Sequence, residues 1–127
     1  MSRSGAIRRL GALLLLAMAA TALRTFQVSA QPAKGNPAAA KPLFAQKCVA
    51  CHKPDGSGGV KLTGNPTPNW KDPKTWADPK RKLVDAYLRD CITNGKIKSG
   101  MVAWGKTGQL KPQQIEDMIA FIKTIKK

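Results

Sequence analysis

The stretch KCVACHKPDGSGG, residues 47–59, contains two of the three cysteines and the only histidine of this 127-residue chain. Cys48 and Cys51 are three positions apart, and His52 follows directly. Four kinds of chemistry use cysteine and histidine in this way: a disulfide, a redox dithiol, a zinc site and covalent attachment of haem. The rest of the sequence decides between them.

Three of these alternatives leave part of the motif unexplained. A disulfide between Cys48 and Cys51 would close a very short loop, would stabilise little, and would give His52 no role. A thioredoxin-like dithiol requires a strand that leads into a helix N-terminus, whereas this pair is predicted at the end of a helix. A zinc site would need Cys91 as its fourth ligand, and two of its other ligands would be adjacent residues.

Covalent haem attachment uses every residue of the motif. Thiols three residues apart lie on one side of a helical turn, so Cys48 and Cys51 can both form thioethers with the haem vinyl groups. His52 then points its imidazole at the iron. We therefore predict that haem c, attached through Cys48 and Cys51, is the cofactor.

The sixth iron ligand is expected to be a methionine, because the chain has no second histidine. Met101 is the candidate: it lies in the stretch SGMVAWG, residues 99–105, where glycines allow the backbone to approach a flat ring. A loop methionine that fills a surface gap is the alternative. Met118 belongs to the apolar stripe of the last predicted helix, where methionine usually fills space.

The first 30 residues predict a cleaved secretory signal. Three arginines precede the apolar run of residues 10–23, and small residues end the segment at Ala30. The run of 14 residues is shorter than the roughly 20 that a membrane-spanning helix needs. We expect export to the periplasm without stable membrane insertion; an uncleaved anchor is the alternative.

The remainder predicts a flexible leader at residues 31–36 and one all-α domain at residues 37–127. Helical patterns cover 37–50, 78–94 and 112–125, and no strand pattern is evident. The intervening loops are long and rich in glycine and proline, which is typical of loops that wrap a functional group. Three main helices with long loops around one haem are therefore expected.

The formal net charge of +15 suggests an acidic partner. In an exported chain we expect acidic redox proteins, as donor and acceptor, rather than nucleic acid. Five lysines flank the segments predicted to contact haem: Lys47, Lys53, Lys96, Lys98 and Lys106. A merely solvated surface is the alternative, because the basic residues are spread along the chain.

With these motifs the chain resembles the small class I cytochromes c, particularly bacterial monohaem electron carriers, over about residues 38–125. The resemblance rests on CVACH at 48–52, an Ile92-x-x-Gly95 turn, and GMVAWG at 100–105. It implies the cytochrome c fold, with His52 as the proximal iron ligand and Met101 as the distal one.

The resemblance also implies that the first and last helices cross, with Ala40 and Phe44 against Met118 and Phe121. Val102 stands where the family usually has proline, and Ala40 stands where it commonly has glycine.

The resemblance extends to tryptophans near the haem. Trp104 and Trp70 are expected to contact it, and Trp70 or Trp76 could donate an indole N–H to a propionate; ordinary anchoring of the loop is the alternative for both.

Axial ligation by His52 and Met101 would fill both sides of the iron, which leaves outer-sphere electron transfer. We therefore predict a soluble, monomeric periplasmic carrier of one electron between respiratory or periplasmic redox proteins, and not an enzyme. A haem peroxidase or a gas-binding cytochrome with a labile distal ligand is the alternative. Cys91 is expected to be a small buried hydrophobe rather than an intermolecular disulfide partner.

Overall fold

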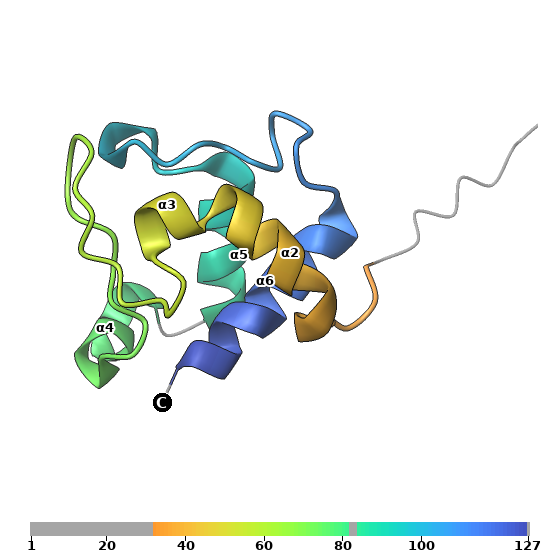
Figure 1. Cartoon of the computed structure of the whole chain (residues 1–127), viewed down its shortest axis with the longest axis horizontal. Helices are drawn as coiled ribbons and strands as arrows, with labels where there is room; N and C mark the ends of the chain where they lie inside the picture. The colour runs from red at the N-terminus through yellow and green to blue at the C-terminus, as the bar shows by residue number, and fades with distance from the viewer. Residues whose placement is uncertain (1–31, 82–83, 127) are drawn as a thin grey trace, which may run out of the picture. The chain divides into compact units, whose positions relative to one another are not determined.

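The computed structural model describes residues 32–81 and 84–126, and in this part the chain is helical (Figure 1). The α-helices and the short 3-10 helices η1 and η2 follow one another as α2 Pro37–Lys47, α3 Val49–His52, α4 Pro73–Ala77, η1 Pro79–Arg81, α5 Val84–Asn94, η2 Ile97–Ser99 and α6 Pro112–Ile125. The only strand-like pairing among these residues is an isolated bridge between Lys96 and Met101. The all-α prediction is therefore confirmed, whereas the predicted signal segment lies outside the described residues.

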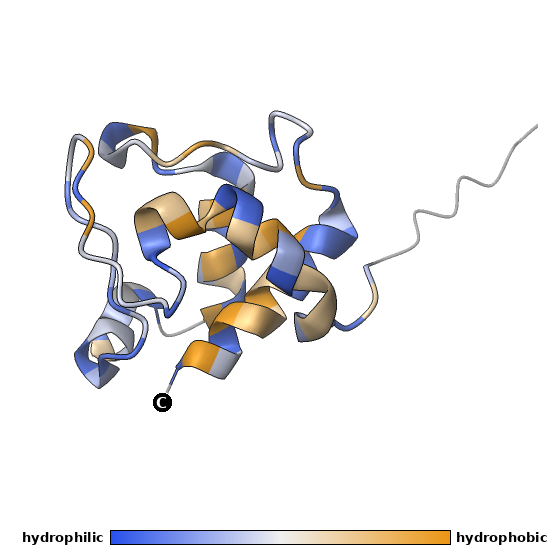
Figure 2. Cartoon of the chain, in the orientation of Figure 1, coloured by the Kyte–Doolittle hydropathy of each residue, from blue (hydrophilic) through white to orange (hydrophobic). Residues whose placement is uncertain are grey.

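The core forms where α6 packs against α2 and α5, and Figure 2 shows hydrophobic residues gathered there. Ala40 has no exposed surface, and Met118 is 1% exposed. The rings of Phe44 and Phe121 are 4.9 Å apart and tilted by 51°. The predicted crossing of the first and last helices is confirmed.

The predicted boundaries of the first helix need a correction. The expected helix over 37–50 is interrupted at Cys48, whose φ of −115° and ψ of −30° separate α2 from α3. The hydrogen bond from the Cys48 N–H to the Phe44 carbonyl, 2.9 Å long, still continues the helical pattern. The CVACH motif therefore begins at the junction of the two helices.

The start of the second predicted helix also differs from the expectation. Asp78 caps the C-terminus of α4, residues 79–81 form η1, and α5 begins at Val84. The preceding Asp72 caps the N-terminus of α4 through a 2.9 Å hydrogen bond from the Lys74 N–H. Both sites carry the sequence Asp-Pro, so the local signal for a helix start is the same at the two positions.

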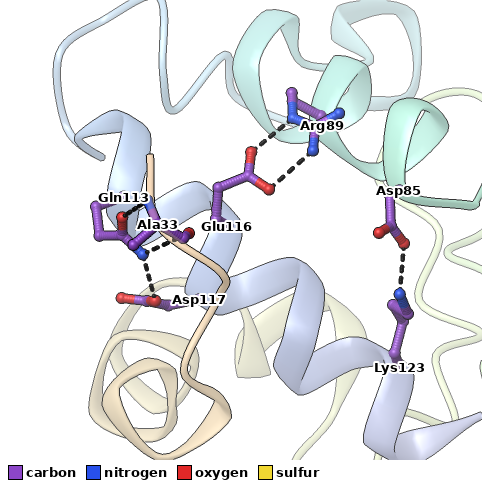
Figure 3. A network of polar contacts seen from close by, with 7 residues as sticks. All are labelled: Ala33, Asp85, Arg89, Gln113, Glu116, Asp117 and Lys123. Atoms are coloured by element: carbon purple, nitrogen blue, oxygen red, sulfur yellow. Dashed lines mark hydrogen bonds and ion pairs between the residues drawn. The ribbon is translucent and has the colours of Figure 1, made fainter. Parts of the chain in front are cut away.

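The segment before α2 lies against α6, although it was predicted to be a flexible leader (Figure 3). The Ala33 N–H donates to Gln113 Oε1 at 2.7 Å, and the Asn36 N–H donates to Asp117 Oδ1 at 2.8 Å. A Cβ on Gly35 would overlap the Glu116 carbonyl. Residues 33–36 thus pack on the domain through specific contacts.

Two ion pairs join α5 to α6 (Figure 3). Arg89 donates two hydrogen bonds to Glu116, at 2.6 and 2.8 Å, and Lys123 lies 2.8 Å from Asp85. All four side chains are partly exposed, so each pair adds little to stability. None of the described helices is both long enough and apolar enough to cross a bilayer.

Candidate haem-binding site

A cavity of about 310 Å³ opens beside α3. Three segments that are distant in the sequence line it: the CVACH motif, the loop that follows α3, and the loop after α5. The predicted site residues Cys48, Cys51, His52, Met101 and Trp104 all line this cavity. The fold therefore brings together residues that are about fifty positions apart.

The two cysteines lie half-buried on one turn that the surrounding loop fixes in place. The His52 N–H donates to the Cys48 carbonyl at 2.8 Å, and the Thr67 hydroxyl donates to the Cys51 carbonyl at 2.7 Å. Burial raises the pKa of the Cys48 thiol to about 11. Cys48 is therefore a neutral thiol near pH 7, unlike the activated thiolate of a redox dithiol.

His52 is buried, with 8% of its surface exposed. Burial lowers the pKa of its imidazole to about 4, so the ring is neutral near pH 7, which is the form that binds a metal. Its Nδ1 atom is buried and has no hydrogen-bond partner among the residues that the structure describes. The indole of Trp70 stacks on the ring, with centroids 4.3 Å apart.

Met101 is held by the loop between α5 and α6. The Lys96 N–H donates to the Met101 carbonyl at 3.1 Å, and the Met101 N–H donates to the Lys96 carbonyl at 3.2 Å. Gly95 and Gly100, with φ of 72° and 84°, form the turns on either side. This arrangement places a methionine in the lining of the cavity that also contains His52.

The three tryptophans differ in their environment. Trp104 lines the cavity, with the Lys47 ammonium 5.1 Å from the centre of its ring. Trp70 is 5% exposed and lines a smaller cavity of about 80 Å³ that shares Cys48 and His52 with the larger one. Trp76 donates its indole N–H to the Trp70 carbonyl at 2.8 Å, so it anchors the loop, and the alternative of a propionate ligand does not fit it.

Sequence reasoning missed a polar group in the cavity wall. Two cations lie near the ring of Tyr87: the Arg81 guanidinium and the Lys96 ammonium are each 5.6 Å from its centre. All three side chains line the cavity. Burial is the main reason that the pKa of Tyr87 is raised. The periodicity of α5 predicted Tyr87 on the apolar face of the helix. Nothing in the sequence indicated that Arg81 would lie beside it.

Cys91 is 7% exposed and lines the smaller cavity. It packs with the core as a small apolar side chain, as predicted, and all three cysteines are free thiols in this structure.

The residues of the cavity fit a haem. Two half-buried thiols lie one turn apart beside a neutral imidazole, and one buried nitrogen of that imidazole has no partner among the described residues. A methionine lies in the wall of the same cavity. Three cations, Lys47, Arg81 and Lys96, are also in the wall, where carboxylates such as the haem propionates can be neutralised. No other chemistry considered for the motif uses all of these groups.

An all-α fold, a CVACH turn beside a cavity, and a methionine loop in its wall define a c-type cytochrome with one haem. The family model described as cytochrome C oxidase, cbb3-type, subunit III matches residues 35–122, and the chain belongs to this family. Neither the curated proteins nor the solved structures contain a significant match to the chain. Haem c, attached through Cys48 and Cys51, is therefore the cofactor, and its chemistry is electron transfer.

Proposed function

We propose that the protein is a soluble, monomeric carrier of one electron in the periplasm, with His52 and Met101 as the axial ligands of its haem iron. The observation that carries the proposal is that both side chains line one cavity, each held by backbone contacts of its own segment. When bound, haem c supplies an iron that exchanges one electron between its ferric and ferrous states. Ligation of the iron by both side chains would leave no open position for a substrate.

The residues around the cavity determine how this chemistry is used. Cys48 and Cys51 tether the group covalently, which retains it in a domain too small to hold it by packing alone. His52 stays neutral and buried. Met101, as a thioether, favours the ferrous state relative to a second histidine. Exclusion of water by the surrounding loops acts in the same direction, because it disfavours the extra charge of the ferric iron.

The surface beside the cavity supports docking to an acidic redox partner. Leu62 and Val102 line the cavity, and they are 56% and 40% exposed. Ile97, in the adjacent η2, is 68% exposed. Of the flanking lysines, Lys47 and Lys96 line the cavity itself. An apolar centre with a basic rim suits a brief contact with a partner of opposite charge.

The family description, which names a cytochrome c oxidase subunit, supports a partner in respiration.

A matched pair of methionine variants tests the axial ligands. Met101→Leu and Met118→Leu make the same chemical change, but Met118 is 1% exposed in the helix core. We expect a low-spin ferric spectrum with a far-red charge-transfer band in the wild type and in Met118→Leu, and loss of that band in Met101→Leu. A band that survives in Met101→Leu would refute Met101 as a ligand. A high-spin wild-type spectrum would instead favour a peroxidase or a gas-binding cytochrome.

Export is tested separately by mass spectrometry of the mature protein. We expect a chain that begins after Ala30, carries one haem, and is recovered from the periplasmic fraction. An intact N-terminus in the membrane fraction would show that the segment is retained as an anchor.

A further inference from the structure

The loop after α3 is closed at its base by Val60 and Thr67. The Thr67 N–H donates to the Val60 carbonyl at 2.9 Å, and the Val60 N–H donates to the Thr67 hydroxyl at 3.0 Å. The same hydroxyl donates to the Cys51 carbonyl at 2.7 Å. Residues 60–67, which we call the strap, therefore extend from the CVACH turn as one closed loop.

The strap also contacts the loop that carries Met101. The Thr63 hydroxyl donates to the Lys98 carbonyl at 2.9 Å. Lys98 belongs to η2, inside the segment whose ends, Lys96 and Met101, pair their backbones. A direct hydrogen bond therefore connects the strap, which is anchored on the CVACH turn, with the methionine loop.

Two glycines allow the strap and the methionine loop to approach each other closely. A Cβ on Gly64 would lie 2.8 Å from the Lys98 carbonyl oxygen, and a Cβ on Gly100 would lie 2.9 Å from the Cβ of Leu62. Because packed atoms cannot overlap, a larger residue at either position would push the two loops apart. Leu62, Gly100 and Met101 all line the larger cavity, so this contact forms part of its wall.

The contact between Thr63 and Lys98 bears on how easily Met101 can leave the iron. A methionine that ligates iron is replaced by a small ligand only when its loop moves away. The Thr63 hydrogen bond exists in the closed arrangement of the two loops and is absent when they separate. Because an equilibrium depends on the difference in free energy between its two states, this bond makes the separated arrangement rarer.

We propose that Thr63 is a positioning residue, whose hydrogen bond to the Lys98 carbonyl holds the strap against the methionine loop and keeps small nitrogen ligands such as imidazole from replacing Met101 at the iron. It acts through the methionine loop rather than on the iron. The strap then supplies a property that separates an electron carrier from a ligand-binding cytochrome. The proposal rests on the proposed function in one respect, namely that Met101 is the distal ligand.

The test measures imidazole binding to the ferric holoprotein through loss of the far-red charge-transfer band. Thr63→Val removes the hydroxyl, and Thr63→Ser retains it. Thr124→Val is the control, because the Thr124 hydroxyl also donates to a backbone carbonyl, that of Phe121, but within α6. Thr63 and Thr124 are both exposed, so neither valine replaces a core residue.

In Thr63→Val we expect the apparent affinity for imidazole to rise roughly twofold to tenfold, as expected for the loss of one hydrogen bond from the closed arrangement. Without imidazole the far-red band should persist, because the backbone pairing of Met101 with Lys96 is intact. Thr63→Ser and Thr124→Val should bind imidazole as the wild type does. A wild-type affinity in Thr63→Val, or an equal rise in Thr124→Val, would overturn the proposal.

Gly64→Ala provides a second test that leaves the Thr63 hydroxyl in place. Its Cβ would press on the Lys98 carbonyl, so it should separate the strap from the methionine loop and raise the imidazole affinity as well. A loss of stability without a change in imidazole affinity would show a merely structural contact and would overturn the proposal. If the wild type itself has no far-red band, Met101 is not a ligand and the proposed function fails instead, so the two failures are distinguishable.

Discussion

Lys96 and Met101 pair their backbones in both directions, with hydrogen bonds of 3.1 and 3.2 Å, and close the six-residue segment that carries η2. The side chain of Lys96 is held in turn by Asp90 on α5, at 3.0 Å. The loop alone therefore does not determine the position of Met101. Its backbone pairing with Lys96 connects it to the end of α5.

Gly95 is the residue on which this bridge depends most directly. Its φ is 72°, and a Cβ there would lie 2.6 Å from the Met101 carbonyl oxygen. We expect Gly95→Ala to lower the free energy of unfolding by at least the roughly 1–3 kcal/mol of a strained backbone. It should also weaken the far-red band, because the carbonyl of Met101 must move. Urea unfolding and the ferric spectrum check the two effects.

Gly108 supplies the matched control for this substitution. Its φ of 73° is nearly the same, but a Cβ there would have nothing within 4 Å. Gly108→Ala should thus show the cost of the backbone conformation and keep the far-red band. Equal loss of the band in both variants would show that the bridge does not position Met101.

The fold was predictable from the sequence where local pattern and packing agree. The stripe of α6 follows from helical periodicity, and the contact of Phe44 with Phe121 follows from the resemblance to the cytochromes c; the structure has both. The break at Cys48 was not predictable, because nothing in the sequence around it excludes a continuous helix. The start at Val84 was missed for a related reason: two Asp-Pro pairs give the same signal, and only tertiary packing distinguishes them.

The cysteines, the histidine and the methionine of the candidate site were predictable from the sequence, whereas the contacts made by the long loop were not. Cys48, Cys51 and His52 follow from spacing alone, and Met101 follows from elimination among few methionines, so the structure needed only to bring them to one cavity. The stack of Trp70 on His52 depends on the path of a loop of about twenty residues that is rich in glycine and proline. Such a loop has no periodicity from which a contact between its two ends could be inferred.

Met118 is expected to contribute to stability as a core residue. It is 1% exposed and packs where α6 meets the other helices. Met118→Ala should lower the free energy of unfolding by about 2–5 kcal/mol, because it leaves a cavity. Met118→Leu keeps the volume and should cost less than about 1.5 kcal/mol. Urea unfolding of the two holoproteins measures the difference, and equal costs would show that the site collapses around the smaller side chain.

Asp117 is expected to hold the segment before α2. It is 6% exposed, and its Oδ1 accepts hydrogen bonds from the Asn36 N–H and from Gln113 Nε2. Asp117→Ala removes both and should lower the free energy of unfolding by about 1–3 kcal/mol, with faster proteolysis near residues 33–36. Asp117→Asn retains one carbonyl oxygen in the same place and should cost less. If both variants resist protease as the wild type does, the segment is held by other contacts, such as those of Gly35.

The basic surface beside the cavity should govern electron transfer with anions. Lys98, on η2, is exposed, and the next residues of the chain, Ser99 and Gly100, line the cavity. Lys98→Glu should slow oxidation of the ferrous protein by hexacyanoferrate(III) roughly twofold to tenfold at low salt, and the deficit should shrink as salt screens the charges. Lys34→Glu makes the same change of charge on the segment packed against α6, outside the cavity lining. Stopped-flow traces at several ionic strengths compare the two variants. The long-range effect of net charge is common to both variants. An equal slowing would therefore show that the local position of Lys98 is irrelevant. A larger effect of Lys98→Glu would show that the electron leaves through the face that carries η2.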